Sequence, residues 1–226
     1  PGPFRFEPYL GIDRHLDSEG AWRLQRDIER GALAGVIMDH YSVRQANALG
    51  LPCKGIPVVS VLSSEGSVKV PALLPDLDAF FDGALARLKA AGSSRIAAVV
   101  LGNSDTWHGL PELERRYSAA GVAWRPEWVQ GVPTMPSFDW GAHAARLLMA
   151  GPRGQRPDGL IVADDNLAVP VASGLLASGI RVPRDLRVVA QANWPTLPEI
   201  ALDFEWLGFD MCDLLDRAVN TIHRLR

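Results

Sequence analysis

The sequence predicts a doubly wound α/β fold, and two observations carry this prediction. Five short apolar runs have the character of strands buried on both faces, at 33–38, 57–62, 96–101, 159–163 and 186–190. Segments with helical periodicity separate them, at about 18–30, 76–91, 111–120, 139–149 and 167–178. Alternating strands and helices form parallel βαβ units with right-handed crossovers.

Composition and charge set limits on function. The chain has 226 residues, of which 47% are hydrophobic, and 23 basic side chains stand against 26 acidic ones, for a net charge of −3. A chain of this size buries roughly 70% of its unfolded surface on folding and needs no disulfides or metal ions to stabilise its core. Because no block of Lys and Arg forms a basic stripe, we expect the chain by itself to bind DNA poorly.

The cysteines and the first residues indicate the compartment. Cys53 and Cys212 are far apart and form no CxxC pair, so neither a disulfide scaffold nor a thiolate metal site is indicated. Charges at Arg5, Glu7 and Asp13 stand where a secretory signal needs an apolar core, and no run reaches membrane-spanning length. We therefore expect a cytoplasmic protein with no membrane partner.

Polar residues follow four of the predicted strands, namely Asp39–His40, Asn103–Asp105, Asp164–Asn166 and Asn193–Trp194. In open parallel sheets, ligands bind outside the carboxyl ends of the strands, where helix N-termini present free N–H groups. The architecture therefore predicts a cleft for a small molecule.

Sequence signatures of catalysis are missing. The chain has no GxSxG elbow, no P-loop, no GxGxxG and no HExxH, and its five histidines lack metal-ligand spacing. We expect no enzymatic activity, no cofactor and no metal. An enzyme on a doubly wound sheet stays open only by analogy of fold.

The segment 157–194 resembles the effector-binding domain of LacI/GalR-type transcriptional regulators. PDGLIVADDNLA followed by GIRVPRDLRVV is similar to the family's PDAI…NDxxA and VPxDhxVV motifs in order and spacing. Upstream, ALAGVIMDH and GIPVVSVLS look like two further strands of the family, and LGFDMCDLLDRAVNTI looks like its late helix. The resemblance covers nearly the whole chain.

This resemblance implies a two-lobed, periplasmic-binding-protein-like (type I) fold in which each lobe is a parallel sheet flanked by helices. The N-terminal lobe would comprise 1–103 plus 207–226, and the C-terminal lobe 104–206. Family members also carry a helix-turn-helix headpiece, a first strand and a last strand that find no match here, so we expect the sequence to be part of a longer protein. Homodimers and a DNA operator, reached only through that headpiece, are the implied macromolecular partners.

The resemblance also implies an effector, a sugar or sugar derivative, held between the lobes. Asp165 matches the family's effector-facing carboxylate and stands between Asp164 and Asn166, although helix capping would explain these residues as well. Ala192 and Asn193 replace the family's acidic pair, and Trp194 offers a flat face for a sugar ring or for ordinary packing.

The remaining candidates come from other strand ends. Asp39 and His40 would reach the ligand from the N-terminal lobe, and Asn103, Asp105 and Trp107 stand at the first crossing between the lobes. The expected function is that of an effector-sensing and dimerisation domain of a transcriptional regulator. The alternative is a periplasmic solute-binding protein that serves a transporter.

Overall fold

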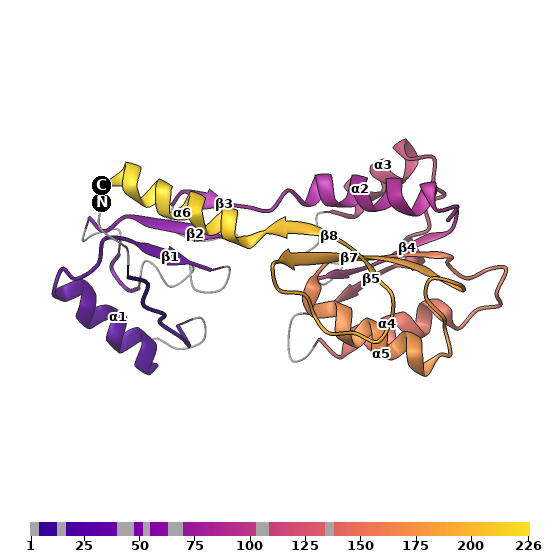
Figure 1. Ribbon diagram of the computed structural model, residues 1–226, viewed down its shortest axis with the longest axis horizontal. Coiled ribbons are helices and arrows are strands. Elements are labelled where there is room, and N and C mark those ends of the chain that lie inside the picture. Colours follow the sequence, from indigo (N-terminus) through magenta and orange to yellow (C-terminus); the bar gives the residue numbers. More distant parts are fainter. Residues whose placement is uncertain are drawn as a thin grey trace. The chain divides into compact units, whose positions relative to one another are not determined.

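Parallel strands form the centre of both units into which the chain divides (Figure 1). The first unit comprises Pro1–Pro75 and Met211–Arg226, and the second comprises Asp76–Asp210. The computed structural model describes residues 5–12, 17–39, 48–51, 55–62, 70–102, 109–133 and 138–226. Within these ranges, none of the helices combines the length and the apolar character that spanning a membrane requires.

The second unit is built on a five-stranded sheet with the order β5-β4-β6-β7-β8, in which every pairing is parallel. Its strands are β4 (Ile96–Leu101), β5 (Val129–Val132), β6 (Gly159–Val162), β7 (Arg187–Trp194) and β8 (Glu205–Asp210). Its helices are α2 (Leu77–Ala90), α3 (Leu110–Ala119), α4 (Trp140–Met149) and α5 (Ala168–Ala177), with the short 3-10 helices η3 (Pro126–Trp128) and η4 (Asp165–Leu167).

Helices cover both faces of this sheet. Along β4, Ala97 and Val99 join the core under α4 and α5, whereas Ala98 and Val100 join the core under α2 and α3. Successive side chains of a strand point to opposite faces. A strand between two helical layers must therefore be apolar throughout, which explains the unbroken IAAVVL run.

Gly174 allows α4 and α5 to pack closely. A Cβ added at Gly174 would lie 2.4 Å from the carbonyl oxygen of Ala142. Gly174 therefore faces α4, and the two helices approach closely at this point. A side chain at position 174 would push them apart.

The first unit has a three-stranded parallel sheet of β1 (Val36–Met38), β2 (Val58–Val61) and β3 (Ala72–Leu73). On one face, α1 (Glu19–Glu29) packs in a core with Met38 and Val58. On the other face, α6 (Met211–Leu225) packs in a core with Val59 and Val61. This unit is therefore a second sheet flanked by helices, as expected.

The boundaries of the units differ from those expected at 103/104 and 206/207. The structure places α2 and β4 in the second unit, because β4 pairs with β5 and β6 and α2 packs on the same sheet. Likewise β8 pairs with β7 through residue Asp210, so the second boundary falls at Asp210–Met211. All five predicted strands are confirmed, whereas β3, β5 and β8 were not predicted.

Candidate functional site

The strand order of the second unit marks one place on its sheet for a ligand. From β4 the chain moves outward to β5, then returns across the sheet to β6 and continues to β7 on the other side. The order therefore reverses between β4 and β6, and ligands of open α/β sheets bind at the carboxyl ends of the strands beside such a switch point. Asp164–Asn166 directly follow β6.

Asp164 caps the turn that follows β6. One oxygen, Oδ1, accepts the backbone N–H of Asn166 and its side-chain Nδ2–H, both at 2.9 Å. Asp164 is the N-cap of η4, so the structure assigns the capping role to Asp164, not to Asp165 or Asn166. The other oxygen of this carboxyl group, Oδ2, accepts no hydrogen bond from the described residues.

The pKa of Asp164 is raised above the ordinary 3.8 of an aspartate, and the main cause is desolvation by burial. The negative charge of Asp165 raises this pKa further, whereas the hydrogen bonds from Asn166 act in the opposite direction. A carboxyl group with a raised pKa at a strand end is a frequent feature of functional sites.

Asp165 and Asn193 come together from neighbouring strands, through a residue that the sequence did not single out. The backbone N–H of Asp165 donates to Gln191 Oε1, at 2.9 Å. Gln191 Nε2 donates to Asn193 Oδ1, and Asn193 Nδ2 donates to Asp165 Oδ2, each at 2.9 Å. The signal that could have found Gln191 is its amide inside the apolar run 188–192 of β7, where a buried polar group needs partners.

Two of the other predicted residues, Trp194 and Asp39, lie within the described part of the chain. Trp194 ends β7 and is 40% exposed, so its ring is accessible to solvent. Asp39 follows β1 in the first unit and is exposed. His40, Asn103, Asp105 and Trp107 lie outside the described residues.

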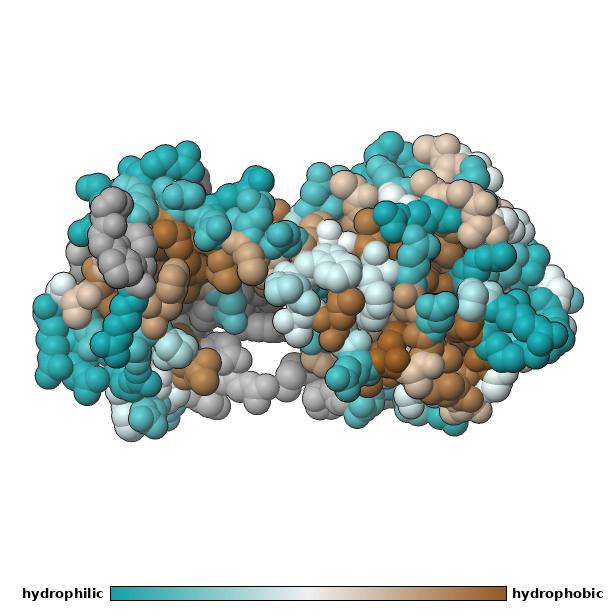
Figure 2. All heavy atoms as spheres, in the orientation of Figure 1, coloured by the Kyte–Doolittle hydropathy of each residue, from teal (hydrophilic) through white to brown (hydrophobic). Residues whose placement is uncertain are grey.

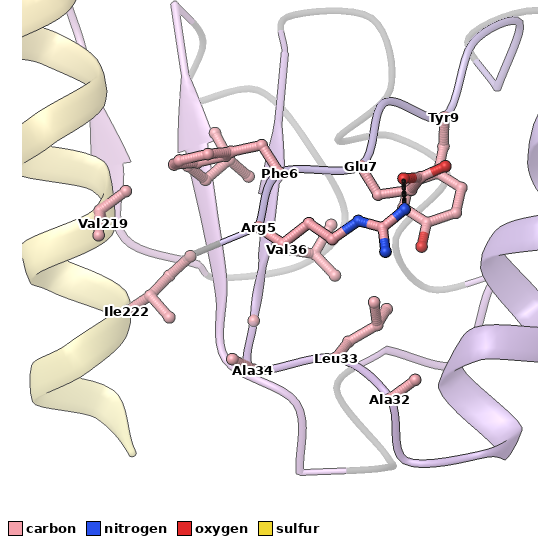
Figure 3. A pocket seen from close by; sticks show the side chains of 12 residues that line it. Arg5, Phe6, Glu7, Tyr9, Ala32, Leu33, Ala34, Val36, Val219 and Ile222 are labelled. Atoms are coloured by element: carbon pink, nitrogen blue, oxygen red, sulfur yellow. Dashed lines mark ion pairs between the residues drawn. The ribbon is translucent and has the colours of Figure 1, made fainter. Parts of the chain in front are cut away.

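A cavity that the sequence did not predict lies in the first unit, along the edge of β1 (Figure 3). Its volume is about 480 Å³, and Val36 and Ile37 of β1 and Val219 and Ile222 of α6 line it together with the segment from Arg5 to Tyr9. Its walls are mostly apolar and it borders the side of a sheet. Three polar side chains, those of Arg5, Glu7 and Tyr9, also line it, and Arg5 and Glu7 form an ion pair at 3.8 Å.

The pKa of Asp164 gives a test by pH. Because that pKa is raised in the folded protein, the folded state keeps the proton at pH values where the unfolded chain has lost it. The contribution of Asp164 to the free energy of unfolding is therefore fully present below the unfolded pKa and is lost as pH rises through the folded one. Asp164→Asn keeps the capping oxygen and does not titrate.

We expect urea unfolding of Asp164→Asn and wild type to show that the variant gains stability relative to wild type as pH rises from the unfolded pKa of this carboxyl group through its raised folded pKa. A stability difference that stays constant over this range would contradict the raised pKa.

Comparisons with known proteins agree with this architecture. The model of the periplasmic binding protein-like domain family matches residues 85–225. A LacI family transcriptional regulator from Lactobacillus casei with bound glucose has a TM-score of 0.69 and 21% identity, over 92% of this chain and 78% of that one. No curated protein is significantly similar in sequence.

Two further solved structures share the fold. The transcription regulator CcpA of Lactococcus lactis has a TM-score of 0.68 and 19% identity, over 95% of this chain and 77% of that one. A putative ribose operon repressor from Burkholderia thailandensis has a TM-score of 0.68 and 21% identity, over 91% of this chain and 76% of that one. The family match covers more than half of the sequence, so the chain belongs to the periplasmic binding protein-like domain family and has the fold of LacI-family transcriptional regulators.

Proposed function

We propose that the chain is the effector-sensing and dimerisation domain of a LacI/GalR-like transcriptional regulator, and that its effector is a sugar or a sugar derivative. The observation that carries this proposal is the cluster of Asp164, Asp165, Asn166 and Asn193 beside the switch point of the second sheet. Carboxylate and amide groups at strand ends bind hydroxyl-rich ligands. Glucose and sucrose are bound in structures of the Lactobacillus casei regulator, which supports this class of effector.

In this proposal the effector also contacts the first unit, through Asp39 and His40, and both units close over it. The effector would bind the closed arrangement more tightly than the open one and so shift their populations. DNA binding would belong to a headpiece outside this chain, in a cytoplasmic protein. Catalysis has no role in this mechanism.

The proposed homodimer is supported by the composition of α5. Its sequence, AVPVASGLLA, has no charged residue, and a helix that is apolar on all sides is normally buried. However, Val169 is 50% exposed and Leu176 is 49% exposed. Gly174 faces α4, so both of these residues lie on the opposite flank of α5. Figure 2 shows apolar side chains at the surface over the region of α4 and α5.

The alternative function, that of a periplasmic solute-binding protein, shares this architecture, but the similar solved structures named above are those of regulators and favour the first function. A solute-binding protein acts as a monomer, whereas a regulator that reads a palindromic operator forms a C₂ dimer. The oligomeric state therefore separates the two candidates.

Thermal unfolding with a panel of monosaccharides, uronic acids and nucleosides tests the ligand site. A ligand at a hundred times its dissociation constant adds about 2.7 kcal/mol to the free energy of unfolding. We expect at least one sugar to stabilise wild type and to have no effect on Asp165→Ala, because that variant lacks the central carboxylate. Asp216→Ala, on α6, is the control and should respond as wild type does. If Asp165→Ala responded as strongly as wild type, the sugar would not bind at this cluster.

Sedimentation velocity of charge-introducing variants tests the dimer. We expect wild type to sediment as a dimer and Leu176→Glu as a monomer, because burying an unpaired carboxylate in the interface is unfavourable. Leu147→Glu is the matched control, since Leu147 is 63% exposed and lies on the flank of α4 that faces away from α5. A monomeric wild type would favour the solute-binding protein.

A further inference from the structure

The hydrogen bonds that join Asp165, Gln191 and Asn193 form a closed ring with only one allowed direction. A backbone N–H can only donate, so the N–H of Asp165 requires the oxygen of Gln191 to face it, as it does at 2.9 Å. This turns Gln191 Nε2 towards Asn193 Oδ1. The amide nitrogen of Asn193 must then face the carboxylate of Asp165, which can only accept.

Gln191 is fully used inside the ring and does not reach solvent. It is 5% exposed, its Oε1 accepts from Asp165, and its Nε2 donates to Asn193 and, at 3.2 Å, to the carbonyl of Ala192. A buried amide with all its groups satisfied locks the orientation of its partners. Gln191 is therefore a positioning residue for Asn193 and for the turn at Asp165.

The ring determines which polar groups stay available to a ligand. Asp164 Oδ2 has no partner in the described part of the chain, and Asp165 Oδ1 has only a long contact, at 3.3 Å, with Asn166 Nδ2. Asn166 Oδ1 is a third acceptor, because both hydrogen bonds of this side chain are made by Nδ2. The cluster thus offers three acceptors but one donor, the second N–H of Asn193. The available groups are thus mainly acceptors, and two of them belong to carboxyl groups.

We propose that this strand-end cluster selects a polyhydroxylated ligand that carries a protonated amine, such as an amino sugar, and rejects acidic sugars. The inference rests on the proposed function and specifies the ligand class of the same site. An ammonium group brings three donors and a positive charge to the carboxyl oxygens, and such charge-assisted hydrogen bonds are about twice as strong as neutral ones. A carboxylate or phosphate would find a single donor, the second N–H of Asn193, beside two carboxyl groups, because the cluster contains no basic side chain.

Binding measurements with matched sugars test the ligand class. Titration calorimetry would compare glucosamine, glucose and glucuronate, and likewise galactosamine, galactose and galacturonate. We expect the amino sugar of a set to bind roughly tenfold more tightly than its neutral counterpart, and the acid to bind most weakly. An acidic or neutral sugar that binds as tightly as the amino sugar overturns this inference and leaves the proposed function standing. Absence of binding by all six overturns both.

A second comparison tests the role of Gln191. Gln191→Met keeps the approximate shape of the side chain and removes the two ring hydrogen bonds that Gln191 makes, so the amide of Asn193 and the turn at Asp165 lose their fixed orientation. We expect the preference for amino over neutral sugar to fall from roughly tenfold towards equality. Gln130→Met is the matched control on β5, where Gln130 donates to the Glu127 carbonyl, and it should keep the preference. An equal loss of affinity for both sugars in Gln191→Met would make Gln191 merely structural.

Discussion

Parallel pairing of β6 with β4 and β7 is the constraint on which the candidate site depends. The register pairs Val162 of β6 with Ala190 of β7. Continued by three residues, it brings Asp165 level with Asn193, and the hydrogen bond between them follows. A slip of one residue would turn Asn193 to the other face of the sheet and break the ring. The apolar residues of β6 and β7 thus determine the register, because each face must meet its own helical layer.

The site also shows how a polar cluster is held at the end of an apolar sheet. Burial raises the pKa of Asp164, so the folded protein carries a carboxyl group that is less stable in its ionised form than in water. Gln191 adds a buried amide to the face of β7 on which Val189 packs in the core with α2 and α3. Features that reduce stability at a strand end are typical of binding sites, where a ligand supplies the missing partners.

The sequence predicted much of the fold, because buried parallel strands and amphipathic helices leave strong local patterns. It missed β5 and β8, whose sequences VQGV and EWLGFD contain polar and glycine residues that interrupt the apolar run. Both strands lie at the edges of the sheet, where a strand pairs with a neighbour on one side alone. The expected boundaries between the units differ from those of the structure for a related reason. The pairing of strands depends on residues that lie far apart in the sequence, so no local pattern reveals it.

The polar strand ends were also visible in the sequence, and Asp165 and Asn193 do meet in the structure. Gln191 was not singled out, because its partners come from the turn after the neighbouring strand and from Asn193, and its own local signal is a single amide within the apolar run 188–192. The central claim, that the effector binds at the carboxyl ends of β6 and β7, is tested most directly by an NMR titration of the labelled protein. We expect saturable shifts in the amide signals of Asp165, Asn166 and Asn193, with those of Val36 and Ile37 unchanged. Shifts confined to Val36 and Ile37, which line the cavity beside β1, would contradict it.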